Sequence, residues 1–211
     1  MKNKNIKNII FDLGGVIVDL DTSKTIGAFS ELSGLPEGDI WKMAEESIFQ
    51  QYEKGEIESE TFREGLRQLL NINSNDNIID KAWNAMIGNT PIHRLEWMSS
   101  LQQQFRVFIL SNTNHIHINY VHDTLNTNYG IENFTNHVEK VYYSQLIGLR
   151  KPDKEIFEFV IDQNNLEPQS TLFLDDNSDN IKGAESIGIQ TAQVAHPEHV
   201  PQILTNAGIQ I

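Results

Sequence analysis

Several features are scarce in this sequence, and each absence excludes a class of protein. The 211 residues include no cysteine, which rules out disulfides, thiolate metal sites and a cysteine nucleophile, and fits a reducing cytosol. Basic residues are few, since 16 Lys and Arg stand against 29 Asp and Glu, and the net charge is −13. Nucleic acids and anionic membranes both attract basic surfaces, so we expect neither as a partner. No apolar run approaches the ~18 residues of a membrane-spanning helix.

The start of the chain also lacks the pattern of a secretory signal. It is basic, but the apolar run after it is interrupted by Asp12 and Asp19, and no small-residue cleavage site follows. The rest of the composition, 39% hydrophobic and 21% charged, is that of an ordinary globular protein. We therefore expect a soluble, cytoplasmic protein with one domain, or with a core and one insertion. The sequence predicts nothing about its oligomeric state.

Short apolar runs alternate with helical patterns in the first 20 residues and again from residue 90. The run Ile9–Phe11 suits a strand buried on both faces; it stops at Asp12, and Gly14-Gly15 indicate a tight turn. Further strands are predicted at 105–110 and 171–174, weaker ones at 138–143 and 190–194, and helices at 92–103, 154–163 and 181–187. This alternation predicts an α/β fold, a Rossmann-like parallel sheet sandwiched by helices.

Residues 21–89 have a purely helical pattern. Apolar residues recur at three- and four-residue spacings over 25–32, 40–52, 61–70 and 78–87, with turn signals between these stretches. We interpret this segment as an inserted helical bundle. The predicted domains are thus a core of residues 1–20 and 90–211 and an insertion of residues 21–89.

Residues with phosphoryl-transfer chemistry follow the predicted strands. They are Asp12, Ser111, Lys151 and the pair Asp175-Asp176. If the sheet is parallel, they meet at its carboxyl edge, where such folds bind ligands. A carboxylate can form an acyl phosphate, clustered carboxylates and a carbonyl bind Mg²⁺, and a serine with nearby N–H groups and a lysine can hold phosphoryl oxygens. Each residue alone has an ordinary explanation as a turn, a helix cap or a surface charge; their coincidence favours a site.

The order of these residues resembles the haloacid dehalogenase (HAD) superfamily of phosphohydrolases. Phe11-Asp-Leu-Gly-Gly-Val is similar to its nucleophile motif, Leu110-Ser-Asn-Thr-Asn to its Ser/Thr motif, Gly148-Leu-Arg-Lys-Pro to its lysine motif, and Phe173-Leu-Asp-Asp-Asn to its metal motif. The similarity spans residues 6–195, and the helical insertion stands where the family carries a small helical cap.

The resemblance implies a role for each of these residues. Asp12 would be the nucleophile and, with Asp176 and the Gly14 carbonyl, would bind Mg²⁺. Lys151 would neutralise the phosphoryl group. Ser111, Asn112 and Asn180 would bind the substrate, a small phosphate ester, and Asp175 would support the site without touching the substrate.

Gly14 departs from the family pattern. Most phosphatases of the superfamily carry an aspartate two residues after the nucleophile as general acid and base, a contribution of about 10²–10⁴-fold, whereas glycine has no side chain to carry a proton. An anomeric sugar phosphate, with a better leaving group, needs this acid less. The variant motif also resembles a bacterial branch that includes α-glucose-1-phosphate phosphatases. The alternative is a catalytically weak phosphate-binding or interaction protein that has lost its acid.

Two other protein classes with a reactive aspartate fit less well. A receiver domain is shorter and carries its acidic pair first, whereas here the pair comes last. A true haloacid dehalogenase uses no metal, which the pair Asp175-Asp176 opposes. Both comparisons favour the phosphohydrolase interpretation.

The sequence identifies few residues of the insertion that could face the substrate. Tyr52-Glu-Lys-Gly-Glu either faces it or is only a helix end, and Asp21 caps the next helix more readily than it donates a proton. Five aromatic residues are expected in the core and not as sugar platforms: Trp41, Phe49, Phe62, Trp83 and Trp97. His115 and His117 do not share a helix face, and we expect both to be solvated.

Overall fold

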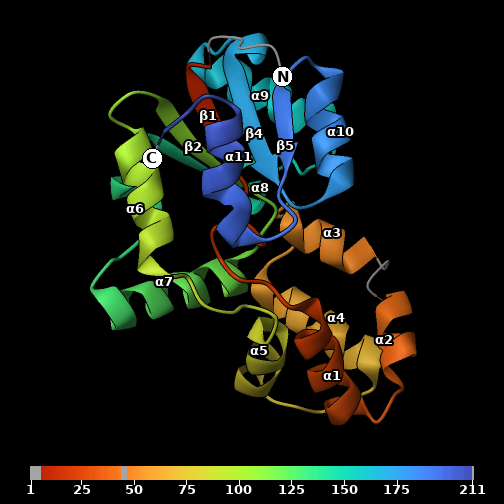
Figure 1. Cartoon of the computed structure of the whole chain (residues 1–211). Coiled ribbons are helices and arrows are strands. Elements are labelled where there is room, and N and C mark those ends of the chain that lie inside the picture. Colours follow the sequence, from red (N-terminus) through yellow and green to blue (C-terminus); the bar gives the residue numbers. More distant parts are fainter. Residues whose placement is uncertain (1–5, 44–46, 211) are drawn as a thin grey trace.

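The computed structural model describes residues 6–43 and 47–210, and its centre is a parallel sheet with the strand order β3-β2-β1-β4-β5 (Figure 1). The strands are β1 (Asn8–Phe11), β2 (Arg106–Ser111), β3 (Lys140–Tyr143), β4 (Thr171–Asp175) and β5 (Gln190–Gln193). In register, Phe11 pairs with Ile109 on one side and with Leu174 on the other. The carboxyl ends of β1, β2 and β4 therefore lie side by side, as predicted.

The side chains of β1 alternate between two hydrophobic clusters because successive strand residues point to opposite faces. Ile9 and Phe11 belong to one cluster and Ile10 to the other, and all three are fully buried. Residues of α6 (Ile92–Leu101), α7 (His115–Tyr129) and α11 (Val200–Asn206) complete the first cluster. Residues of α9 (Lys154–Asn164) and α10 (Ser178–Ser186) complete the second. The sheet is thus sandwiched between two helical layers, which confirms the predicted fold class.

A group of helices lies below the carboxyl edge of the sheet (Figure 1). It consists of α1 (Thr22–Ser33), α2 (Glu37–Met43), α3 (Ser47–Glu53), α4 (Ser59–Leu70) and α5 (Asp76–Asn84). These helices share a third cluster, which also takes in Ile116 from α7. The helix predicted over residues 40–52 is divided between α2 and α3, and residues 44–46 lie outside the described part of the chain. Asp21 caps α1 by accepting a hydrogen bond from the Ser23 N–H, as expected.

The two connections to these helices run side by side. The Asp21 N–H donates to the Met86 carbonyl and the Gly88 N–H donates to the Asp19 carbonyl, each over 2.8 Å. Asp19 also pairs with the buried Arg94 of α6, over 2.7 Å. The hydrogen bonds between the two connections support the proposal that residues 21–89 form a cap inserted into the core. This domain division stays a prediction.

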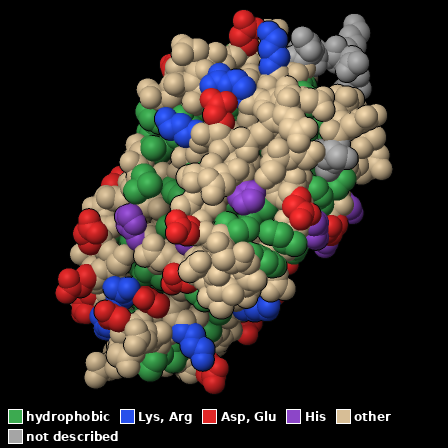
Figure 2. Space-filling view, turned by 90° about the vertical axis from the view of Figure 1, so that its left-hand side faces the viewer, with side chains coloured by type: hydrophobic (Ala, Val, Ile, Leu, Met, Phe, Trp, Pro, Cys, Tyr) green, Lys and Arg blue, Asp and Glu red, His purple; other side chains and the backbone are tan. Residues whose placement is uncertain are grey.

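Three helices have no counterpart among the predicted elements: α7, α8 (Ser144–Ile147) and α11. Because α8 follows β3 directly, Lys151 lies four residues beyond α8 and not at a strand end, so that part of the prediction is wrong. No helix within residues 6–43 and 47–210 is long and apolar enough to cross a membrane. In Figure 2, acidic side chains (red) are denser over the lower, helical part of the face in view than over the sheet domain.

Candidate active site

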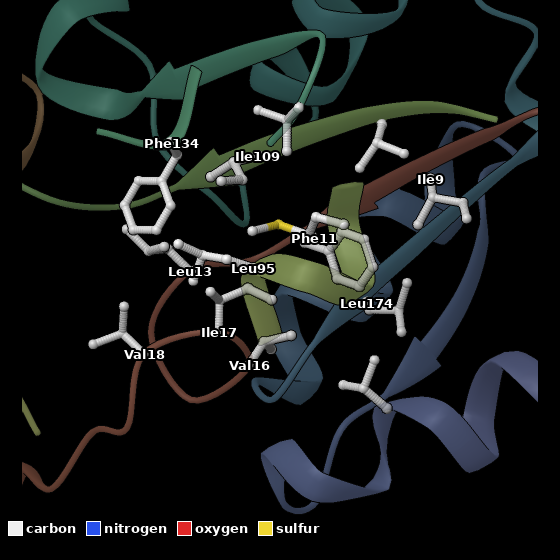
Figure 3. Packing of buried hydrophobic residues seen from close by; sticks show 14 of the residues in the cluster. Ile9, Phe11, Leu13, Val16, Ile17, Val18, Leu95, Ile109, Phe134 and Leu174 are labelled. Carbon is white, nitrogen blue, oxygen red and sulfur yellow. The ribbon is translucent and has the colours of Figure 1, made fainter. Parts of the chain in front are cut away.

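Asp12 stands directly after β1, at the start of a loop that is anchored in the core. Leu13, Val16, Ile17 and Val18 of this loop are buried in the same cluster as β1 (Figure 3). The Leu13 N–H donates to Asp12 Oδ1 over 2.7 Å, and the carboxyl group is largely buried. Packing on both sides thus fixes the carboxylate that we predict as the nucleophile.

Lys151 is buried between two carboxylates. Its Nζ lies 2.8 Å from Asp12 Oδ1 and 2.6 Å from Asp175 Oδ2, and the residue is only 1% exposed. Burial alone would lower the pKa of Lys151, but the two carboxylates outweigh it and the pKa is raised, so the ammonium stays charged. Burial also disfavours the charged form of Asp12 and raises its pKa to about 7, although the nearby Lys151 ammonium acts to lower it.

Asp175 is fully buried, and hydrogen bonds surround it. Besides Lys151, it accepts from the Asn177 N–H over 2.8 Å and from Asn180 Nδ2, which lies 3.0 Å from both of its oxygens. These contacts orient the carboxylate toward the lysine, in keeping with the predicted supporting role. Asn180 is placed against Asp175 by the same bonds, and its predicted contact with the substrate stays a prediction.

Asp176 lies over the glycine turn that follows Asp12. Gly15 has a φ of +74°, and a Cβ there would overlap Oδ2 of Asp176, so this position requires glycine for its conformation and for space. Gly14 differs, because a Cβ there would meet only Leu20, at 3.4 Å. A Cβ could therefore be accommodated at Gly14, so this position, unlike Gly15, does not require glycine for space.

Asn112 holds the lysine loop against β2. Its Nδ2 donates to the Lys151 carbonyl and its Oδ1 accepts from the Lys151 N–H, each over 2.8 Å. The side chain of Asn112 is therefore used in positioning Lys151, and its predicted contact with the phosphoryl group stays a prediction. Ser111 is buried at the end of β2, and its predicted role in phosphoryl binding is untouched by this arrangement.

The acidic residues at this edge can hold a divalent cation. Asp12, Asp175 and Asp176 each offer a carboxylate oxygen, and these atoms lie within 4.8 Å of one another. Three carboxyl groups face one ammonium, so acidic groups outnumber cations at this edge. Burial raises the pKa of Asp176, and the neighbouring Asp175 raises it further. Hard oxygen ligands with this excess charge fit a divalent ion such as Mg²⁺. Because Asp175 is enclosed by donors, Asp12 and Asp176 stay the predicted carboxylate ligands.

A cavity of about 270 Å³ opens beside this cluster. Its core side includes Gly14, Ser111 and Asn112, and its cap side includes Thr22, Glu53 and Trp83. The cavity therefore joins the phosphate-binding candidates to residues 21–89. Of the turn Tyr52-Glu-Lys-Gly-Glu, Tyr52 is buried and Glu53 lines the cavity.

The surroundings of His117 and of Trp83 differ from what the sequence led us to expect. His117 stacks on Trp83, with ring centroids 4.6 Å apart, and both line the cavity. The His117 Nε2 donates to the Trp83 carbonyl over 3.1 Å and Nδ1 accepts from the Asn114 amide over 3.2 Å, so the ring is bound in its neutral form. Burial lowers its pKa to about 4. His117 is thus not solvated and Trp83 is not merely core; the α7 cap at Asn114 was the signal that could have indicated this helix and its faces.

The other aromatic predictions have mixed outcomes. Phe62 is fully buried, as expected, whereas Trp41 is 50% exposed, so that expectation is wrong. Phe49 and Trp97 are partly buried and pack against hydrophobic clusters.

The model of the haloacid dehalogenase-like hydrolase family matches residues 6–188. The chain belongs to this family. It is similar to the D-ribitol-5-phosphate phosphatase of Bacteroides thetaiotaomicron, with 34% identity over 190 residues that cover 89% of this chain and 91% of that protein.

Solved structures agree with this assignment. A HAD family enzyme of B. thetaiotaomicron in complex with magnesium and inorganic phosphate is 33% identical, with a TM-score of 0.80, and the match covers 89% of this chain and 93% of that chain. A predicted HAD-like hydrolase of Porphyromonas gingivalis is 27% identical with a TM-score of 0.86, covering 96% and 97%. The predicted family is confirmed; the narrower branch with α-glucose-1-phosphate phosphatases stays a prediction.

Proposed function

We propose that the protein is a Mg²⁺-dependent phosphatase that hydrolyses a small sugar or polyol phosphate through an aspartyl-phosphate intermediate. The observation that carries this proposal is the arrangement of Asp12, Lys151 and Asp175 beside Asp176 at the carboxyl edge of the sheet. A cavity lined by the neighbouring Gly14, Ser111 and Asn112 lies at the same edge. Membership in a hydrolase family and the similarity to a D-ribitol-5-phosphate phosphatase support it. So does the magnesium and phosphate complex of a related enzyme.

In the first half of the reaction, Asp12 attacks the phosphorus atom. A bond forms between Asp12 Oδ2 and phosphorus while the bond from phosphorus to the alcohol oxygen breaks, and the alcohol takes up a proton. Lys151 and the Ser111 hydroxyl offset the negative charge on the phosphoryl oxygens. Mg²⁺ bound by Asp12, Asp176 and the Gly14 carbonyl would screen the carboxylate from the phosphate and stabilise the transferring charge.

In the second half, water attacks the phosphorus of the aspartyl phosphate. Inorganic phosphate leaves and the Asp12 carboxylate is restored, with the water proton passing to a base or to solvent. Lys151 remains bonded to Asp175 and keeps its position through both halves. Asp175, in turn, is held by Asn180, so this charge pair is fixed before the substrate arrives.

Gly14 bears on the choice of substrate. With no carboxyl group there, the leaving alcohol must be protonated by solvent or by another residue, which slows alkyl phosphates more than anomeric ones. We propose an anomeric sugar 1-phosphate as the narrower substrate class on this ground. A 5-phosphate of ribitol, the substrate in the name of the related enzyme, is an alkyl phosphate and is the competing class.

The test is phosphate release from a panel of sugar and polyol phosphates with Mg²⁺ and with EDTA, comparing the wild type with Asp12→Asn. We expect metal-dependent release by the wild type and none by the variant. If no member of the panel is hydrolysed above the variant's background, the enzyme proposal fails. Faster turnover of ribitol 5-phosphate than of glucose 1-phosphate would overturn only the anomeric preference.

One observation favours a second candidate, a phosphate-binding or interaction protein with little catalysis. Glycine at position 14 is not imposed by space, because a Cβ there would meet only Leu20. The complete set of Asp12, Ser111, Lys151 and Asp176 opposes this candidate. Tight binding of inorganic phosphate without turnover of any ester would favour it.

A further inference from the structure

Glu53 places a carboxylate at the cap end of the site cavity. It is the last residue of α3 and lines both this cavity and a second one, of about 180 Å³ and mainly apolar, inside the cap helices. Its side chain is 27% exposed. Glu53 thus lines the same cavity as Gly14 and Ser111.

Arg150 holds Glu53 from outside the cavity. Its Nε and Nη2 lie 2.9 and 2.8 Å from the same oxygen, Oε2. Arg150 is not among the residues that line the cavity, so the positive charge stands behind the carboxylate. Both contacts use Oε2, which leaves Oε1 to accept a hydrogen bond from a bound molecule.

The backbone around Glu53 is fixed against the core. Gly55 has a φ of +67°, and a Cβ there would overlap the Gln145 carbonyl of α8. One residue before Glu53, the Tyr52 hydroxyl accepts a hydrogen bond from the Ile116 N–H over 3.2 Å. Tyr52 and Gly55, which stand on either side of Glu53 in the sequence, are both in close contact with the core. The Glu53 carboxylate therefore keeps its place when the cap is closed.

Arg150 is paired with Glu53 from outside the cavity, and in the described part of the chain no residue with a positive charge lines the cavity. Among the described residues that line the cavity, Glu53 is the only one with a charged side chain at neutral pH, since His117 is neutral. The cap end of the cavity is otherwise lined by apolar side chains, apart from the Thr22 hydroxyl. Lys151 is already bonded to two carboxylates. Residues 21–89 as a whole carry 13 Asp and Glu against 6 Lys and Arg.

We propose that Glu53 is a specificity-determining residue that accepts a hydroxyl of the leaving alcohol and rejects alcohols with a second negative charge. The preferred substrates are then phosphate monoesters of neutral, hydroxyl-bearing alcohols, and phosphorylated acids and bisphosphates are excluded. This inference rests on the proposed phosphatase function and adds to it the charge of the leaving group. Repulsion between two carboxylates in a partly screened pocket changes binding by about tenfold.

The test compares glycerol 3-phosphate with 3-phosphoglycerate, which differ in replacing a neutral CH₂OH by a carboxylate. We expect the wild type to prefer glycerol 3-phosphate by at least about tenfold in kcat/KM. Glu53→Gln keeps the shape and a hydrogen-bond acceptor, and it should reduce this ratio by about tenfold. Glu56→Gln makes the same charge change at an exposed residue of the same turn and should leave the ratio unchanged.

Arg150→Gln separates charge selection from a merely structural role of the ion pair. If the pair only holds the cap closed, Arg150→Gln and Glu53→Gln should have the same effect. If Glu53 selects by charge, Arg150→Gln leaves the carboxylate uncompensated and should raise the ratio, opposite to Glu53→Gln. An equal effect of both variants, or an unchanged ratio in Glu53→Gln, overturns the inference.

Binding measurements distinguish failure of this inference from failure of the proposed function. Asp12→Asn cannot form the aspartyl phosphate, so calorimetry with this variant reports binding of the two esters without turnover. Tighter binding of glycerol 3-phosphate than of 3-phosphoglycerate, lost on adding Glu53→Gln, supports the inference even if the wild type hydrolyses nothing. Equal binding of both esters overturns it, even if the wild type proves to be a phosphatase.

Discussion

The core end and the cap end of the site are built on different principles. At the core end, Asp12, Lys151 and Asp175 are buried in mutual ion pairs on a rigid sheet edge. At the cap end, the carboxylate of Glu53 and the stacked rings of Trp83 and His117 lie among apolar side chains on helices. The first arrangement suits a reaction common to all phosphate esters, and the second suits the recognition of one class of alcohol. Chemistry and specificity are thus separated in space.

The largest expected effect belongs to the core end. Asp12→Asn removes the nucleophile, so turnover should fall by at least about 10⁴-fold for every substrate, whatever its alcohol. Phosphate release with Mg²⁺ measures this, and circular dichroism checks that the variant is folded. A loss that differed strongly between substrates would break the division between the two ends.

Lys151→Met should destabilise the fold as well as stop catalysis. Removing the ammonium leaves Asp12 and Asp175 buried without their partner, a cost of about 3–5 kcal/mol. Urea unfolding in EDTA measures it, and Mg²⁺ should restore part of the loss because a cation offsets the same carboxylates. Lys182→Met is the control, since Lys182 is 72% exposed and should change stability by no more than about 0.5 kcal/mol. A Lys151 variant as stable as this control would contradict the buried charge pairing.

His117 makes the stability of the cap end depend on pH. Its folded-state pKa of about 4 lies below the ordinary 6.5, so between these values the unfolded chain binds a proton that the folded protein does not. Acid in this window therefore favours unfolding, by up to about 3 kcal/mol at pH 4 and about 2 kcal/mol at pH 5. The contribution is fully present above pH 6.5.

Urea unfolding at pH 7 and pH 5 tests this dependence. The wild type should lose more stability between the two values than His117→Asn, whatever the variant's stability at pH 7. His115→Asn, two residues away and without the stacking on Trp83, should behave as the wild type does. If His117→Asn shows the same fall as the wild type, His117 is not held neutral by its surroundings.

The smallest expected effect lies where the two ends meet. Gly14→Asp restores an acid at a position with space for it, and should raise kcat for alkyl phosphates by about tenfold, a part of the usual acid contribution. Anomeric phosphates should gain less, because their leaving group needs the proton less. Parallel assays on glycerol 3-phosphate and glucose 1-phosphate compare the two gains. Equal gains would refute the explanation of Gly14 by leaving-group chemistry.

The fold was predictable where apolar runs were continuous and was missed where polar residues form helices. The runs that became β1, β2 and β4 lie in the centre of the sheet and are buried except at Arg106, so their sequences are largely apolar. In α7 the sequence His-Ile-His-Ile alternates like a strand, and packing of Ile118, Val121 and Leu125 on the sheet decides for a helix. Local pattern therefore failed where tertiary contacts outweigh propensity.

The site was predictable at its core end and only in part at its cap end. The residues at the ends of β1, β2 and β4 lie together because parallel strands end at one edge. Lys151 reaches the same place by a different route, beyond α8 and through the bonds of Asn112 to its backbone. The sequence offered the turn that contains Glu53 as a segment facing the substrate, but no spacing indicates that Trp83 and His117 line the cavity, because the packing of α5 and α7 decides it.

The sequence by itself determined the chemistry of this protein, and the tertiary structure decided its geometry and selectivity. Scarce basic residues, absent cysteines and four short motifs were enough to indicate a HAD hydrolase with an Asp12 nucleophile and no acid at Gly14. The use of Asn112 to position Lys151, the space left at Gly14 and the carboxylate of Glu53 in the cavity became evident only in the fold. The physical reason is that catalytic motifs are local in the chain, whereas a cavity is formed by side chains that only packing brings together.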